Sequence, residues 1–155
     1  MPAAPRRRRP LGRPVPKSPE VSQRMQQMPS RGTGPEQRLA AELRRRRYAV
    51  REHDADLPGR PDLVLPRLRV AIFVHGCFWH GCPRHGTLPK HNRAWWREKI
   101  RRNRERDVRN VRRLRRLGWS VFEVWEHEDP GTAMWRLGAL ERRRAEAGVR
   151  TARRG

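Results

Sequence analysis

Cysteine and histidine side chains gather in one short stretch of the chain, where metal binding is the chemistry that they favour. Cys77 and Cys82 are separated by four residues, a spacing found among structural zinc ligands. His80 and His85 lie in the same stretch, and His127 follows a later apolar run. Two thiolates and two imidazoles would close a tetrahedral zinc site and hold an irregular loop in place. The alternative is that the cysteines are small buried residues and the histidines are solvated.

A second candidate group is the carboxylate of Asp62, which follows a Gly-Arg-Pro turn and begins an apolar run. Carboxylate oxygens are suitable ligands for Mg²⁺, and metal-assisted cleavage of a phosphodiester needs such ligands. Glu36, Asp107 and Glu123 are further candidates of the same kind. The alternative role of Asp62 is that of an ordinary turn or strand-start residue.

Two histidines, His75 and His80, flank the segment Gly-Cys-Phe-Trp. Imidazole exchanges protons near neutral pH, so either residue could activate water or protonate a leaving 3′ oxygen. Solvated loop histidines are the alternative interpretation.

Large aromatic side chains occur beside these histidines. Phe78 and Trp79 lie outside any periodic pattern, which favours a wedge that enters between DNA bases. The alternative is an aromatic cluster that caps a sheet. Trp95 and Trp96 come soon afterwards, and Trp96 matches the apolar stripe of a helix, which predicts burial in the core.

The apolar periodicity predicts the elements that carry these residues. Helices are expected at 35–47, 94–117 and 132–147, and strands at 48–53, 62–66, 69–76 and 119–126. The segment 70–74 is almost entirely apolar, which indicates a central strand covered on both faces. Residues 75–94 lack periodicity and read as a functional loop. The order predicts an α/β fold, a small mixed sheet with helices on both faces.

Length and charge limit the function further. The chain has 155 residues, about one domain, and 38 Lys and Arg against 16 Asp and Glu give a net charge of +22. No apolar run is long enough to cross a membrane, and two cysteines do not make a disulfide scaffold. The basic N-terminus lacks the apolar region of a secretory signal, so we expect a cytoplasmic protein. Such a positive charge requires a polyanion partner, for which nucleic acid is the leading candidate.

The two ends of the chain differ from the middle. Residues 1–20 hold six prolines and an Arg6–Arg9 run, which predicts a disordered arm, either a solubilising tail or a tether for DNA phosphates. Residues 21–31 are less biased and read as a short helix that ends near Pro29. Residues 148–155 read as a loose basic tail.

Several motifs together resemble the Vsr DNA mismatch endonuclease family, over about residues 20–128. They are SQRMQQMPSRGTGPEQRL, LPGRPD, FVHGCFWHGCPRHG, WWREKIRRNRERD and LGWSVFEVWE. The resemblance implies a restriction-endonuclease-like three-layer fold over residues 21–147, with 21–31 contacting DNA. It also implies that the enzyme nicks the T-containing strand 5′ to the mismatched T of T:G pairs, which arise when 5-methylcytosine deaminates. The other expectations concern cofactors and partners. They are catalytic Mg²⁺ and structural zinc, double-stranded DNA as the partner with mismatch-repair factors as further partners, and a monomer associated with the nucleoid.

The resemblance also assigns roles to individual residues. Asp62, His75, His80 and Glu36 match the catalytic residues, and Asp62 with the Val74 backbone carbonyl matches the Mg²⁺ ligands. Asp107 matches a supporting residue of the long helix. The expected zinc ligands are Cys77, Cys82, His85 and His127, which leaves His80 free for catalysis. The expected DNA wedge consists of Met25, Phe78, Trp79 and Trp96, and this assignment revises the core placement of Trp96.

Three other functions fit parts of the sequence. The first is a non-catalytic, zinc-stabilised nucleic-acid-binding protein, which leaves Asp62 beside two histidines without a role. The second is a basic ribosome-associated or structural protein. The third is a nuclease of the same fold with another target.

Overall fold

The computed structural model describes residues 31–152, with side chains through residue 147, and before them only residues 12, 14, 15, 18–20, 23 and 27. Met25, and most of the 1–20 arm and of the 21–31 segment, lie outside the described residues. The elements are α2 (Gly34–Arg45), β1 (Arg51–Glu52), β2 (Leu63–Leu65), the 3₁₀ turn η1 (Pro66–Leu68), β3 (Val70–His75), α3 (Arg93–Arg116), β4 (Ser120–Trp125) and α4 (Pro130–Ala152). None of the described helices is long and apolar enough to cross a membrane.

The four strands form one mixed sheet in the order β1-β2-β3-β4. β2 pairs antiparallel with both β1 and β3, whereas β3 pairs parallel with β4. The parallel pair requires a long crossover, which α3 supplies. The predicted central strand is therefore confirmed, because β3 lies between β2 and β4.

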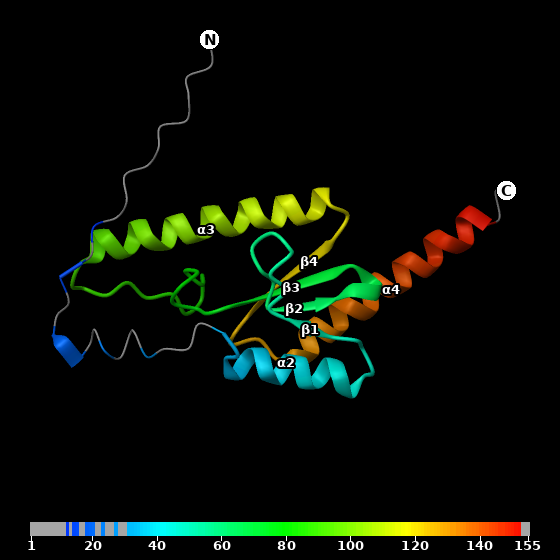
Figure 1. The fold of residues 1–155 in the computed structure, drawn as a ribbon, viewed down its shortest axis with the longest axis horizontal. Coiled ribbons are helices and arrows are strands. Elements are labelled where there is room, and N and C mark those ends of the chain that lie inside the picture. Colours follow the sequence, from blue (N-terminus) through cyan, green and yellow to red (C-terminus); the bar gives the residue numbers. More distant parts are fainter. Residues whose placement is uncertain are drawn as a thin grey trace, which may run out of the picture.

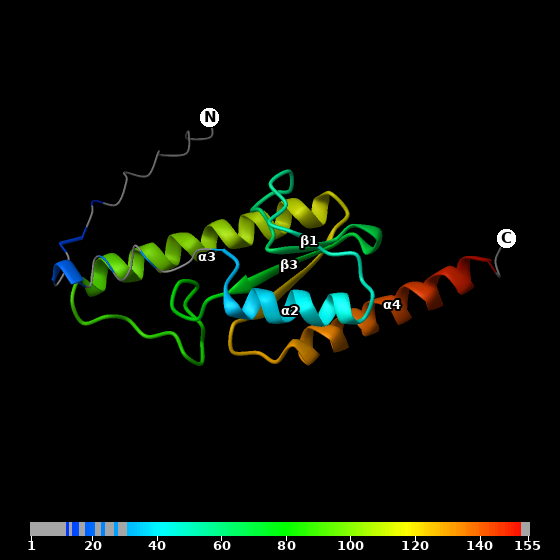
Figure 2. The ribbon, with the colours of Figure 1, turned by 60° about the horizontal axis from the view of Figure 1, so that its bottom comes forward.

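Helices cover both faces of the sheet, as the order of elements predicted. α2 and α4 lie on one face and α3 on the other (Figure 1), and a second view shows the same layers (Figure 2). The main core lies between the sheet and the α2–α4 pair, where Leu39, Leu43 and Leu137 meet Leu63 and Ile72. Side chains that alternate along β2 and β3 face opposite sides, so Val64 and Ala71 are buried toward the α3 layer.

Two boundaries differ from the expectation. The predicted strand 48–53 pairs only over Arg51–Glu52, because the chain is still leaving α2 at Tyr48, whose amide donates to the Leu43 carbonyl at 3.1 Å. The last helix starts at Pro130 and continues to Ala152, five residues past the predicted end at 147. Between the end of β3 at His75 and the start of α3 at Arg93 the chain is irregular, as predicted for the 75–94 loop.

Candidate functional site

Asp62 is placed at the end of the sheet where β2 begins and β3 finishes. Its Oδ2 accepts a hydrogen bond from the Val74 amide at 2.7 Å, and its backbone carbonyl accepts one from the His53 amide at 2.9 Å. Because β2 and β3 are antiparallel, the start of β2 and His75 at the end of β3 lie at the same end of the sheet. The carboxylate and the histidines of the loop are therefore neighbours.

The turn that leads into Asp62 depends on Gly59. This residue has a φ of +81°, and an added Cβ would lie 2.7 Å from the Asn110 side chain of α3. A glycine is required both by the left-handed backbone and by the close approach of the helix. The LPGRPD motif thus docks the turn before Asp62 on α3.

Glu36 reaches the same region from the first turn of α2. Pro35 suits the first helical positions, and a carboxylate there is favoured by the partial positive charge of the helix end. Glu36 is buried, with 6% of its surface exposed, and it accepts hydrogen bonds from the Gly32 amide and the Thr33 hydroxyl, both at 2.8 Å. His53 Nε2 lies 3.6 Å from Glu36 Oε2. Glu36, His53 and Asp62 can each offer one ligand atom, and these atoms lie within 4.8 Å of one another.

The electrostatics of Asp62 favour a cation. Burial raises the pKa of Asp62, and the charge of Glu36 adds to the increase, while the Val74 amide and the His53 and His75 rings oppose it. An ionised carboxylate in this position is destabilised by desolvation, which a bound cation would offset.

His75 and His80 form the adjacent group, with ring centroids 4.2 Å apart. His75 Nε2 is 3.1 Å from Glu123 Oε1, and His80 Nδ1 is 2.6 Å from Asp107 Oδ2. The pKa of Glu123 is lowered by its hydrogen bond with His75. Burial opposes ionisation of Asp107, but the hydrogen bond from His80 and the charges of His80, Arg106 and His75 together outweigh it and lower the pKa of Asp107. Each histidine is thus oriented by an ionised carboxylate.

The four predicted zinc ligands come together. Cys77 Sγ lies 3.1 Å from His127 Nδ1 and 4.0 Å from His85 Nδ1, and Cys82 Sγ lies 3.9 Å from both nitrogens. Zinc–sulfur and zinc–nitrogen bonds of ordinary length in a tetrahedron would place sulfur and nitrogen about 3.6 Å apart. The measured separations bracket that value, so this donor set fits a tetrahedral zinc ion.

The two thiols differ in how readily they lose a proton. Burial and the neighbouring Cys82 raise the pKa of Cys77 to about 12. Burial also opposes ionisation of Cys82, but the backbone amides of His85 and Arg84, the contact with Cys77 and the charge of Arg84 together outweigh it and lower the pKa of that thiol. Glu126 accepts a 2.7 Å hydrogen bond from the Cys77 amide and so connects the loop to the segment after β4.

The aromatic residues form one edge-to-face cluster. Phe78 lies 5.1 Å from both Trp79 and Trp96, and Trp95 lies 4.7 Å from Trp96, measured between ring centroids. Phe78 and Trp79 are half-buried, whereas Trp96 is only 7% exposed. Trp96 is thus buried, as its helical position alone indicates, and the wedge role that the resemblance assigns to it stays a prediction.

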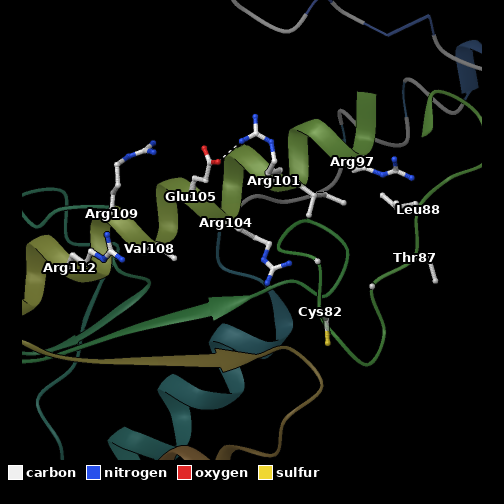
Figure 3. Close-up of a pocket in the computed structure, with 13 residues that line it drawn as sticks. Cys82, Thr87, Leu88, Arg97, Arg101, Arg104, Glu105, Val108, Arg109 and Arg112 are labelled. Atoms are coloured by element: carbon white, nitrogen blue, oxygen red, sulfur yellow. Dashed lines mark hydrogen bonds and ion pairs between the residues drawn. The ribbon is translucent and has the colours of Figure 1, made fainter. Parts of the chain in front are cut away.

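A basic groove runs along one flank of α3 and borders the Cys82–Leu88 part of the loop (Figure 3). Its cavity is about 660 Å³, and Ile100, Val108 and Leu88 are among its lining residues. Arg101 is paired with Glu98 and Glu105. Four other arginines of the groove are in no ion pair within the part of the chain that the structure describes: Arg97, Arg104, Arg109 and Arg112.

Comparison with known proteins identifies the family. The family described as DNA mismatch endonuclease Vsr matches residues 17–85. The chain is 46% identical over 121 residues to the type II nicking enzyme V.XorIIP of Xanthomonas oryzae pv. oryzae, covering 77% of this chain and 85% of the relative. The chain belongs to the Vsr DNA mismatch endonuclease family. The DNA mismatch endonuclease Vsr of Escherichia coli is also 46% identical, over 108 residues that cover 68% of each chain. The type II nicking enzyme V.NaeI of Lentzea aerocolonigenes is 40% identical over 121 residues, covering 75% of this chain and 73% of the relative.

As a Vsr-family endonuclease, the protein is a hydrolase that acts on DNA. A non-catalytic binding protein and a ribosomal protein are therefore excluded. The structure brings Asp62 and Glu36 together in one group, and His75 and His80 together in another. The sequence analysis did not name His53 as a site residue. The signal that could have found it is its place opposite Asp62 where β1 pairs with β2. The sequence analysis named Glu123 only as a candidate carboxylate ligand for Mg²⁺ and did not predict its contact with His75.

Proposed function

We propose that this endonuclease nicks the T-containing strand of T:G mismatched DNA, 5′ to the mismatched T, and so starts the repair of deaminated 5-methylcytosine. The observation that carries the proposal is the placement of two carboxylates, Asp62 and Glu36, beside the His75–His80 pair at one end of the sheet. The E. coli relative is named a DNA mismatch endonuclease, which supports the same substrate. We further propose a restriction-endonuclease-like monomer whose endonuclease domain spans 21–147, acting in the cytoplasm on nucleoid DNA.

The residues that would hold Mg²⁺ are Asp62 and the Val74 backbone carbonyl. Leu63 pairs with Ile72, so two residues further along the antiparallel register Pro61 stands opposite Val74. Proline has no N–H, so Pro61 cannot donate to the Val74 carbonyl as the ladder would otherwise require. The Val74 amide turns instead to the Asp62 carboxylate. A backbone oxygen and a carboxylate at one edge fit a hard cation.

Mg²⁺ bound there would supply polarisation of the scissile phosphate and a more acidic water. The protein's own residues position and move protons. His80 is bonded to Asp107 through Nδ1, which leaves Nε2 to take a proton from water or give one to the leaving 3′ oxygen. Glu123 orients the His75 ring in the same manner, through a contact between its carboxylate and His75 Nε2.

The wedge and the basic surfaces would select and hold the duplex. We propose that Phe78 and Trp79 enter the stack beside the mismatch, with Trp96 behind them and Met25 contributing from the N-terminal segment. A T:G pair is more easily unstacked than a normal pair, and this difference in free energy supplies discrimination. The unpaired arginines of the α3 groove would contact phosphates, which adds affinity without reading sequence.

The proposed structural zinc joins the loop to the segment after β4. Its ligands would be Cys77, Cys82, His85 and His127, and its effect would be to fix His80 and the wedge relative to the sheet. In a reducing compartment a disulfide could not do this.

A strand-resolved nicking assay tests the function. The full chain and Asp62→Asn are incubated in Mg²⁺ with T:G and T:A duplexes that differ only at that pair, in several flanking sequences. We expect the full chain to nick only the T strand of T:G duplexes, 5′ to the T, and the variant to be inactive. Equal nicking of both duplexes would refute the proposed specificity, and an active Asp62→Asn would refute the proposed centre.

A further inference from the structure

His53 completes a triangle of potential ligands with Glu36 and Asp62. Its Nε2 is 3.6 Å from Glu36 Oε2, and one ligand atom from each of the three side chains lies within 4.8 Å of the others. The three residues come from separate parts of the chain: the segment after β1, the first turn of α2, and the residue before β2. Nothing in their sequence spacing brings them together.

The backbone of His53 is held in an uncommon conformation. Its φ is +51°, in the left-handed region that few residues other than glycine adopt. The 2.9 Å hydrogen bond from its amide to the Asp62 carbonyl ties it to the residue whose carboxylate it accompanies. Its side chain is 25% exposed, so the ring lies at the rim of the buried carboxylates. The backbone conformation and this hydrogen bond together fix the position of the ring beside the two carboxylates.

A nitrogen donor changes the cation that such a centre prefers. Mg²⁺ prefers a shell of oxygen ligands and retains several waters, whereas imidazole suits transition metals. Carboxylates suit both Mg²⁺ and Mn²⁺. A set of two carboxylates and one imidazole therefore favours Mn²⁺ over Mg²⁺.

We propose that the side chains of His53 and Glu36 join Asp62 and the Val74 carbonyl as ligands of the divalent cation, and that His53 makes this centre bind Mn²⁺ more tightly than Mg²⁺. The inference rests on the proposed function, because the centre is the proposed catalytic one. The competing explanation is that His53 only forms an ion pair with Glu36 when protonated.

Two variants of His53 separate these explanations. His53→Asn keeps a residue that tolerates the left-handed backbone but is too short to reach the cation. His53→Gln extends further and offers oxygen in place of nitrogen. His91→Gln is the matched control, because His91 is an exposed histidine whose Nε2 lies 3.0 Å from the Val15 carbonyl, away from this centre.

The test uses the zinc-loaded full chain without DNA. Mn²⁺ and Mg²⁺ affinities are measured by titration calorimetry, and pulsed electron paramagnetic resonance of bound Mn²⁺ detects ¹⁴N coupling from a coordinated imidazole. We expect the unmodified chain and His91→Gln to bind Mn²⁺ at least about tenfold more tightly than Mg²⁺, with ¹⁴N coupling. Both His53 variants should lose the coupling, and their Mn²⁺ preference should fall by about tenfold.

The outcomes distinguish this inference from the proposed function. Persistent ¹⁴N coupling, or an unchanged Mn²⁺ preference in both His53 variants, would overturn His53 as a ligand while leaving T:G nicking by the unmodified chain in Mg²⁺ intact. Mn²⁺ binding by Asp62→Asn with undiminished affinity would show that the ion binds elsewhere and would overturn the inference as well. Absence of T:G nicking by an unmodified chain that shows the ¹⁴N coupling would overturn the proposed function alone.

Discussion

His80 Nδ1 and Asp107 Oδ2 lie 2.6 Å apart and join the Cys/His loop to the inner face of α3. The contact also fixes which nitrogen of His80 carries the proton, because an ionised carboxylate accepts from Nδ1–H. Asp107 therefore acts on the reaction through His80, as a positioning residue. The relationship predicts a specific kinetic defect.

Replacing Asp107 by Asn should lower kcat on T:G duplexes by about 10²-fold, since the amide can stabilise the wrong tautomer of His80. DNA affinity should change little, because Asp107 is turned toward the loop. Single-turnover nicking and a binding titration separate the two quantities. A loss of affinity equal to the loss of rate would contradict a positioning role.

Replacing Asp62 by Asn should stabilise the metal-free protein at pH 7. Burial raises the pKa of Asp62 in the folded state, so the favourable protonated form is present at low pH and is lost as the pH rises through that pKa. At pH 7 the buried charge is a cost that the amide avoids. We expect the Tm to rise by about 2–4 °C, with the gain shrinking toward pH 3.

The matching control for Asp62 is the addition of Mg²⁺ or Mn²⁺. The ion should raise the Tm of the unmodified chain and leave that of Asp62→Asn nearly unchanged, because ligand binding stabilises only the state that binds. An equal response of both proteins would place the cation elsewhere.

Removal of zinc should loosen the Cys/His loop. We expect about one tightly bound zinc per chain by elemental analysis, and loss of it in Cys82→Ala with a fall in Tm. Cys82→His offers a replacement ligand and should retain part of the metal. A folded, active sample that contains no zinc would refute the site.

The aromatic cluster should divide into two functional parts. Trp96→Ala should cost about 3–5 kcal/mol of folding free energy, because Trp96 is buried. Phe78→Ala with Trp79→Ala should instead lower T:G over T:A selectivity more than stability. Thermal melts and nicking ratios on the same samples test this, and a collapse of Tm in the double variant would assign those two rings to the core.

The arginine groove should set the salt dependence of DNA binding. Replacing Arg104 and Arg112 by Ala should reduce the slope of log K against log salt by about 0.9 for each phosphate that the protein no longer neutralises. T:G selectivity should be unchanged. Arg143→Ala, at an exposed position on α4, is the control, and an identical slope in all three proteins would remove the groove from the DNA surface.

Much of the fold was predictable because it depends on local periodicity. The apolar stripe of α3, the continuous apolar run of β3 and the Gly118 stop are properties of neighbouring residues. They correctly indicated a mixed sheet with helices on both faces. The strand at 48–53 was overestimated, because its β-branched and aromatic residues do not reveal that Tyr48 still bonds back to α2.

By itself the sequence determined the family and the donor types of the metal-binding loop, since both depend on residues close together in the chain. Only the tertiary structure brought His53 to Glu36 and Asp62, placed Glu123 on His75, and set Pro61 opposite Val74. These contacts join segments up to 48 residues apart. They depend on strand register and on how helices dock, and neither is encoded in the spacing of the residues that meet.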